Sequence, residues 1–281
     1  MVQEGKSIVI PWDFTPVAEH ALEHGLILAK QLDKEINLVH VIDKAEPAEV
    51  ENKSRLGLES LAEKTYQKHG IKPVGTILRG SIFSRISEYA SNESTVLVVM
   101  GTHGIKGMQK VTGSWALKVI VGSKVPFIVV QEPPKPNQYK NLIFPVDFKS
   151  ENKEKLFWCI YLARYFNSKV ILFKYPIADK SLLKKVNTNL NFAVRFLIQN
   201  NVQYEIQTAP SGAKFTRETL NFAGSVDADL IIINTTKHIN FTDYLLGAEE
   251  QQVISNNSRI PVMCVNPRSS FSGVGQFMYG R

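Results

Sequence analysis

The amino-acid sequence repeats itself at the length of a whole domain. Segment 8–14 (IVIPWDF) returns as 142–148 (LIFPVDF), 80–85 (GSIFSR) as 212–217 (GAKFTR), and 125–130 (VPFIVV) as 260–265 (IPVMCV). The three offsets are 134, 132 and 135 residues, so few insertions or deletions separate the two halves. This pattern indicates duplication of a complete fold, in contrast to a solenoid of short repeats. The 281 residues are therefore predicted to form two domains of ordinary size.

Each half alternates short apolar runs with longer segments of helical periodicity, which is typical of βαβ units around a parallel sheet. The predicted strands are 7–12, 36–42, 73–78, 95–100 and 126–131, then 141–146, 169–175, 203–208, 229–234 and 261–265. The predicted helices are 16–32, 48–69, 82–91, 114–123, 150–166, 180–200, 214–225 and 247–256. The strands are mostly continuous apolar runs, as expected where helices cover both faces of the sheet.

A proline-rich segment, 131–137 (QEPPKPN), separates the two halves, and its three prolines cannot continue a helix or a central strand. We predict an N-terminal domain over residues 1–133 and a C-terminal domain over 138–268. The closing stretch 269–281, rich in glycine and serine, is predicted to be a mobile tail.

The net charge of +7 lies mainly in the second half, since residues 1–135 carry 16 Lys and Arg against 15 Asp and Glu. The basic residues are scattered and not interleaved with aromatics, which argues against nucleic-acid binding. No stretch approaches the roughly 20 apolar residues of a membrane span, and the first residues lack the pattern of an export signal. Cys159 and Cys264 lie in apolar runs and are predicted to be buried free thiols, which fits a cytoplasmic protein; a disulfide between them is the alternative.

The segment most specific for chemistry is 101–114 (GTHGIKGMQKVTGS), which follows an apolar strand and opens a predicted helix. Glycines let backbone N–H groups approach an anion, and the helix start adds unpaired N–H groups and a positive dipole end. This arrangement predicts a phosphate-binding loop at the carboxyl edge of the sheet. It is not a Walker loop, because no Lys-Ser/Thr pair follows the last glycine. The alternative is a flexible connector with a serine helix cap.

The sequence resembles the universal stress protein family at Pro11-Trp12-Asp13, at Val39-His40-Val41 and at the glycine-rich loop. The resemblance covers essentially the whole chain as a tandem of two such domains. It implies Rossmann-like five-stranded parallel sheets of order 3-2-1-4-5, often in dimers, and a nucleotide motif of the form G-x2-G-x9-G-[ST]. The two halves are then expected to pair through their last strands, as the family's dimers do, and the chain to form a possible homodimer.

The resemblance implies that ATP or another adenine nucleotide binds in the first half, with a divalent cation as a possible companion. Asp13 would contact the adenosine portion, Val41 would line the adenine pocket, and the loop glycines would surround the phosphates. The implied binding residues are Pro11, Trp12, Asp13, Val41, Met100, Gly101, His103, Gly104, Gly113, Ser114 and Trp115. The sequence departs from the family pattern by having eight residues between the second and third motif glycines, and by Ala116 where a hydroxyl is often found. Trp12 replaces a smaller residue and would either crowd the base or stack on it.

The second half has lost most of this motif. The segment 234–248 (NTTKHINFTDYLLGA) keeps the nine-residue interval but lacks two of the three glycines and the final hydroxyl. We predict a structural or regulatory role for this half. Lys237 still offers a point charge to an anion, and Asp147 is interpreted as a possible cap of local backbone groups.

Catalytic chemistry has little support in the sequence. His103 is interpreted as an exposed loop residue or a phosphate contact, and His40 as a hydrogen-bonded core residue. His20 and His24, four residues apart, could share a metal, but a solvated helix face is the preferred interpretation. There is no catalytic triad, acid-base pair or zinc ligand set, so slow ATP hydrolysis is the most that is expected.

Two functions fit these observations. The first is a cytoplasmic stress-response protein whose N-terminal domain binds an adenine nucleotide and whose surface is read by a protein partner. The second is a nucleotide-independent, dimeric interaction module of the same family.

Overall fold

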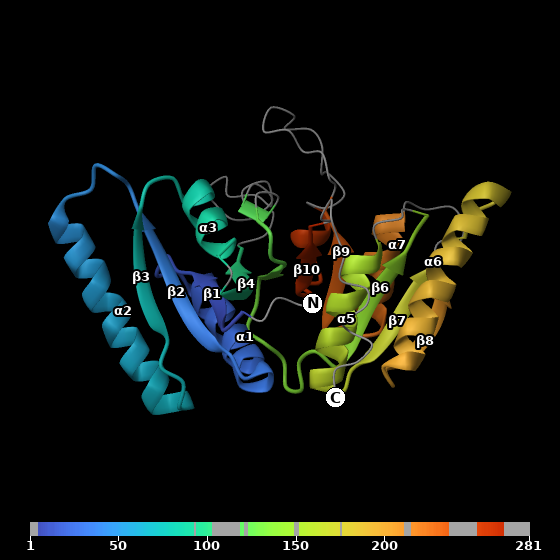
Figure 1. Ribbon diagram of the computed structural model, residues 1–281, viewed down its shortest axis with the longest axis horizontal. Helices are drawn as coiled ribbons and strands as arrows, with labels where there is room; N and C mark the ends of the chain where they lie inside the picture. Colours follow the sequence, from blue (N-terminus) through green and yellow to red (C-terminus); the bar gives the residue numbers. More distant parts are fainter. Residues whose placement is uncertain are drawn as a thin grey trace. The chain divides into compact units, whose positions relative to one another are not determined.

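The computed structural model describes residues 5–92, 94–102, 119–120, 123–148, 152–174, 176–210, 215–235 and 252–266. The chain divides into two compact units, the first ending at Pro134 and the second beginning at Lys135 (Figure 1). Cys159 and Cys264 are buried and form no disulfide, as predicted. None of the described helices is long and apolar enough to cross a membrane.

The first unit is a five-stranded parallel sheet whose strands alternate with helices along the chain. Its elements are β1 (Ser7–Pro11), α1 (Pro16–Leu32), β2 (Glu35–Ile42), α2 (Ala48–His69), β3 (Val74–Arg79), α3 (Ile82–Ala90), β4 (Thr95–Gly101) and β5 (Phe127–Val130). The strand order β3-β2-β1-β4-β5 confirms the predicted order 3-2-1-4-5. Because crossovers between parallel strands are right-handed, α1 and α2 cover one face of the sheet and α3 the other.

The second unit repeats this topology. Its elements are β6 (Asn141–Val146), α5 (Asn152–Phe166), β7 (Lys169–Lys174), α6 (Lys180–Gln199), β8 (Gln203–Thr208), α7 (Phe215–Ser225), β9 (Leu230–Asn234) and β10 (Val262–Val265). Within this unit the parallel strands are ordered β8-β7-β6-β9-β10. The predicted helix 114–123 lies mostly outside the described residues, and so does the first half of the predicted helix 247–256; residues 119–120 and 252–254 are helical.

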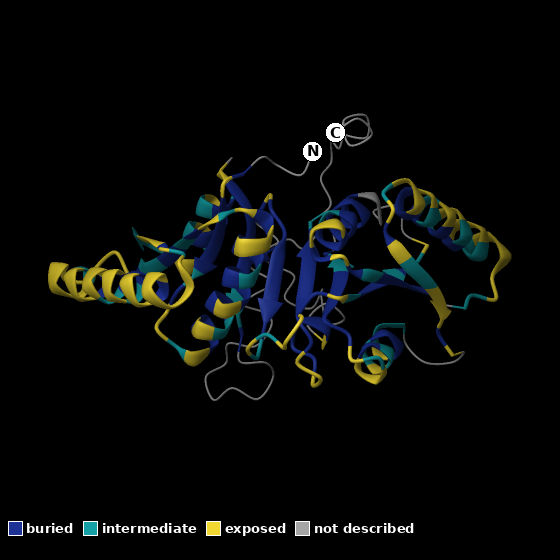
Figure 2. Cartoon of the chain, turned by 90° about the horizontal axis from the view of Figure 1, so that it is seen from below, coloured by how far each residue is buried: buried dark blue, intermediate teal, exposed yellow. Residues whose placement is uncertain are grey.

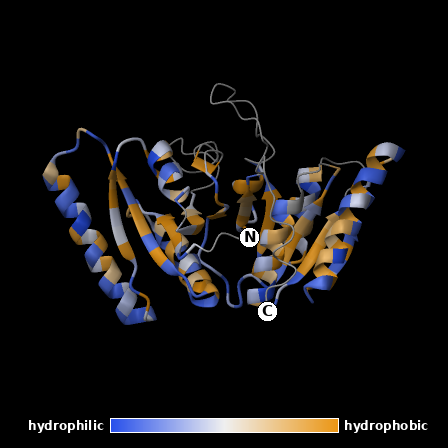
Figure 3. Ribbon diagram, viewed as in Figure 1, coloured by the Kyte–Doolittle hydropathy of each residue, from blue (hydrophilic) through white to orange (hydrophobic). Residues whose placement is uncertain are grey.

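The core of each unit is the layer of apolar strand residues between helices. Ile8, Val9 and Ile10 of β1 are completely buried, and Figure 2 shows strands buried beneath helices that expose their outer sides. The hydropathy colouring of Figure 3 separates the apolar strands from the largely hydrophilic α2. Burial on both faces explains why the strands read as continuous apolar runs in the sequence.

Helix α1 begins where the sequence predicts, since Thr15 has extended backbone at the N-cap and Pro16 occupies the first turn. The Thr15 hydroxyl makes no cap hydrogen bond and instead donates to the carboxylate of Asp13. The turn that connects β1 to α1 is therefore stabilised by a side-chain contact within the Pro11-Trp12-Asp13 region.

Candidate functional site

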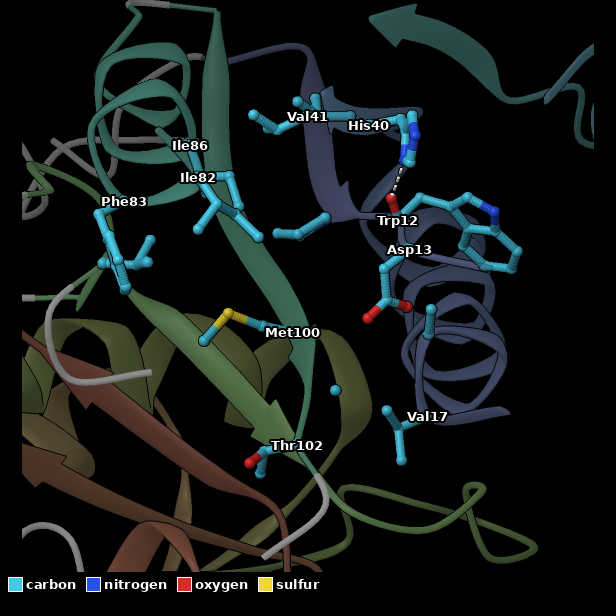
Figure 4. Close-up of a pocket in the computed structure, with 15 residues that line it drawn as sticks. Trp12, Asp13, Val17, His40, Val41, Ile82, Phe83, Ile86, Met100 and Thr102 are labelled. Carbon is cyan, nitrogen blue, oxygen red and sulfur yellow. Dashed lines mark hydrogen bonds between the residues drawn. The ribbon is translucent and has the colours of Figure 1, made fainter. Parts of the chain in front are cut away.

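A cavity of about 140 Å³ lies in the first unit at the carboxyl ends of β1, β2 and β4 (Figure 4). Its described lining residues are Pro11, Trp12, Asp13, Val17, Ala18, Val39, His40, Val41, Ile82, Phe83, Ile86, Met100, Gly101, Thr102 and Val119. Most of these side chains are apolar. Since engineered cavities of about 150 Å³ bind benzene, the described cavity has room for an aromatic ring but not for a whole nucleotide.

The position of the cavity follows from the sheet topology. The chain runs from β1 outward to β2 and β3 and then crosses back to β4 on the other side of β1. In such sheets the loops after β1 and β4 diverge to opposite faces, which opens a crevice at the carboxyl edge where ligands bind. The start of α1 borders this crevice on one side and α3 on the other.

Gly101 is required where β4 passes the first turn of α1. A Cβ atom built on Gly101 would lie 2.2 Å from the carbonyl oxygen of Val17, closer than any real contact allows. The next residue, Thr102, is buried and donates its backbone N–H to Val130 O at 2.9 Å. The chain that leaves β4 is thus held between α1 and β5 as far as Thr102, the last residue of the glycine-rich segment that the structure describes.

Asp13 places an exposed carboxylate at the rim of the cavity. Its Oδ1 atom accepts the backbone N–H of Thr15 at 3.1 Å and the Thr15 hydroxyl. Figure 4 shows the carboxylate between Trp12 and the start of α1. A carboxylate fixed in this way can accept further hydrogen bonds from amino or hydroxyl groups of a ligand.

Trp12 borders the cavity, but its indole does not fill it. The indole points away from Met100 and Ile82 in Figure 4, is only 4% exposed, and meets the ring of Phe14 edge-on at 6.0 Å. The carbonyl of Trp12 lies 2.7 Å from Nδ1 of His40. The half-buried His40 is therefore hydrogen-bonded, as the sequence predicted, and it fixes the end of β1 against β2.

Phe14 has a left-handed backbone with φ of 62°, which is unusual for a bulky residue. Such strain costs on the order of 1–2 kcal/mol and points to a constrained site. Its ring packs edge-on against His40 at 5.1 Å, and a Cβ on Gly57 of α2 would lie 2.9 Å from it. Sequence reasoning missed this feature, although the Asp-Phe pair recurs at Asp147-Phe148.

The predicted solvated face for His20 and His24 is wrong for His24. His24 is 1% exposed, and its Nε2 lies 3.2 Å from the carbonyl oxygen of Glu132. His20 Nδ1 lies 3.3 Å from the carbonyl oxygen of Gln131. Burial, and secondarily the neighbouring His20, lowers the pKa of His24 to about 3. Both rings therefore contact the segment after β5, and no group of three or more potential ligands for a metal occurs in the described part of the chain.

The structure brings six of the predicted site residues together around the cavity: Pro11, Trp12, Asp13, Val41, Met100 and Gly101. The other predicted residues, His103, Gly104, Gly113, Ser114 and Trp115, lie outside the described residues, as do Ala116 and Lys237. Sequence reasoning missed the wall formed by α3, namely Ile82, Phe83 and Ile86. The available signal was the repeated segment 80–85, where this helix begins.

Comparison with known proteins agrees with this architecture. Residues 5–131 match the model of the universal stress protein family. A curated universal stress protein of Methanocaldococcus jannaschii is 33% identical over 143 residues, which cover 46% of this chain and 84% of the relative. The chain belongs to the universal stress protein family. A second such protein of the same organism is 28% identical, with 45% of this chain and 94% of the relative covered.

Solved structures share the fold over nearly the whole chain. A universal stress protein from Archaeoglobus fulgidus superposes with a TM-score of 0.77 at 18% identity, covering 96% of this chain and 99% of that one. A protein from Pseudomonas aeruginosa described as a putative universal stress protein gives a TM-score of 0.66 at 13% identity, with 95% of each chain covered. At these identities the likeness concerns the fold alone.

Proposed function

We propose that the first unit binds ATP or a related adenine nucleotide, and that the chain acts as a nucleotide-dependent regulatory or interaction module in a stress response. The observation that carries the proposal is an apolar cavity of the size of an aromatic ring, whose lining includes the first two residues of the glycine-rich segment 101–114. Membership of the universal stress protein family supports the stress-response part. Cys159 and Cys264 are buried thiols outside any disulfide, which is compatible with a reducing cytoplasm.

The described residues fit an adenine ring. Val41, Ile86 and Met100 offer apolar contacts from two strands and α3, and a methionine thioether packs favourably against aromatic rings. Asp13 lies at the rim, where its carboxylate can accept hydrogen bonds from a ribose hydroxyl or an exocyclic amine. The phosphates and an accompanying divalent cation would then lie toward the loop after Thr102, where glycine N–H groups are suited to an anion.

Calorimetric titration with MgATP, adenosine and GTP tests the proposal. Ile86 is 1% exposed on the cavity side of α3, so Ile86→Trp should fill the cavity and weaken ATP binding by at least about tenfold. The matched control is Leu56→Trp, which adds the same side chain at a position of α2 that is 66% exposed and should leave affinity unchanged. Circular dichroism must show that both variants are folded. Equal ATP affinity of the two folded variants, or no binding by the unaltered protein, would overturn the proposal.

A further inference from the structure

The second unit has a phenylalanine, Phe173, at the position where the first unit has Val39, a residue that lines the cavity. In the first unit Pro11 of β1 pairs with Val39 of β2, and in the second Pro145 of β6 pairs with Phe173 of β7. Pro11 and Pro145 are equivalent in the internal repeat. Phe173 is therefore the counterpart of Val39, which lines the cavity.

The Phe173 ring lies on the α7 side of its sheet, and α7 is the counterpart of α3, which borders the cavity in the first unit. It is 1% exposed and lies parallel to two rings of α7, at 4.5 Å from Phe222 and 5.9 Å from Phe215. Phe215 is the counterpart of the cavity residue Phe83, by the 132-residue offset of segments 80–85 and 212–217. The space between β7 and α7 in the second unit is thus filled by stacked aromatic side chains.

Two further substitutions alter the same region. By that offset Phe222 replaces Ala90, which is completely buried in the first unit. Glu218 replaces Ile86, and this carboxylate-bearing residue is only 6% exposed. A bulky ring and a buried acidic residue in place of small or aliphatic side chains disfavour the entry of a planar base and of an anionic ligand.

We propose that Phe173 is an internal plug, and that the residue at this position of the second strand decides which unit accepts a planar aromatic ring. Val39 leaves the ring-sized cavity of the first unit open, whereas the Phe173 ring occupies its counterpart. The proposal rests on the proposed function only in taking adenine as the ligand ring that the first unit binds. Whether Phe173 fills the space in the second unit depends on shape alone, so it can be tested with an uncharged aromatic ligand.

Reciprocal substitutions test the position in the first unit. Val39→Phe should weaken MgATP binding at least tenfold in calorimetry, and Phe173→Val should leave it unchanged. Val74→Phe is the matched control, because it adds the same ring on an edge strand at a position that is 54% exposed. If the unaltered protein binds MgATP and Val39→Phe binds it equally well, the assigned role of this position is wrong.

Indole, a neutral planar ring, tests the plug in the second unit without reference to nucleotide. In a protein carrying Val39→Phe, indole should find no ring-sized cavity in either unit, and adding Phe173→Val should create a site for it. Spectral shifts of residues on β7 and α7 in nuclear magnetic resonance would locate this site. If the double variant is not folded, Phe173→Leu replaces Phe173→Val in the same comparison.

The two arms separate the possible failures. Absence of MgATP binding by the unaltered protein refutes the proposed function, while the indole comparison still tests the plug. A folded double variant that binds indole no better than Val39→Phe alone, or binds it away from β7 and α7, refutes the plug.

Discussion

Mild acid should destabilise the first unit because His24 is buried in its neutral form. The side chain is 1% exposed on α1 and lies 3.2 Å from the carbonyl oxygen of Glu132. Its pKa is lowered from 6.5 to about 3, mainly by burial and secondarily by His20, four residues earlier on the same helix. A proton on His24 would therefore have to be accommodated where water has been excluded.

The sign and size of the effect follow from linkage. Above pH 6.5, the ordinary pKa of histidine, the ring is neutral in both states and its contribution is fully present. As the pH falls below 6.5 the unfolded chain takes up a proton that the folded chain refuses, and stability is lost until the folded pKa of about 3 is reached. At about 1.4 kcal/mol per pH unit on the steep part of this curve, the loss between pH 7 and pH 5 is about 2 kcal/mol.

Hydrogen exchange of α1 peptides during urea unfolding at pH 7 and pH 5 can follow the first unit separately from the second. In His24→Gln the amide is neutral at both pH values, so the pH-dependent loss should shrink by about 2 kcal/mol relative to the unaltered protein. His20→Gln should retain most of the loss, because burial of His24 is the larger cause of its lowered pKa. An equal loss in the unaltered protein and in His24→Gln would refute the reasoning.

Two further substitutions test contacts at opposite ends of the strands. Gly101→Ala brings a Cβ to within 2.2 Å of the Val17 carbonyl oxygen, so overpacking should cost about 1–3 kcal/mol in urea unfolding and should weaken MgATP binding; unchanged stability would contradict the close approach. In the second unit Oδ2 of Asp229 accepts the backbone N–H groups of Lys140 and Asn141, each at 2.8 Å. Asp229→Ala should therefore cost about 1–3 kcal/mol, whereas Asp229→Asn keeps an acceptor and should cost less; equal losses would show that these bonds do not contribute.

Much of the fold could be predicted because its signals are local. Apolar runs bounded by turn residues placed the strands within one or two residues of their observed ends, and the internal repeat required both units to have one topology. Four cavity residues at the ends of β1, β2 and β4 were predicted through the family motifs and the glycine-rich loop, namely Pro11, Val41, Met100 and Gly101. The contribution of Ile86 was not, because the face of α3 that meets the sheet depends on how the crossover packs.

His24 was misinterpreted for the same reason, since its burial also depends on tertiary packing. The spacing of His20 and His24 places both on one side of α1, and that side was predicted to face solvent because the sequence shows no third ligand for a metal beside them. It is the segment after β5, more than a hundred residues later in the chain, whose carbonyl groups meet the two rings. Contacts of this kind are set by tertiary packing, which helical periodicity does not report.

The two units differ at the position of Val39 and Phe173 in a way that favours stability in the second unit and an open binding site in the first. In the second unit Phe173 packs against two parallel rings, which adds buried apolar contact at the position of Val39. The first unit keeps a cavity there and holds Phe14 in a strained conformation beside it. A cavity lacks the contacts that a filled core would make, so an open site is maintained at the expense of stability. On the proposed function, a ligand that fills the first unit restores those contacts, whereas the second unit already contains its own ring. On this view, ligand binding would raise the stability of the first unit, whereas the stability of the second unit, whose cavity position is filled by Phe173, would not depend on ligand.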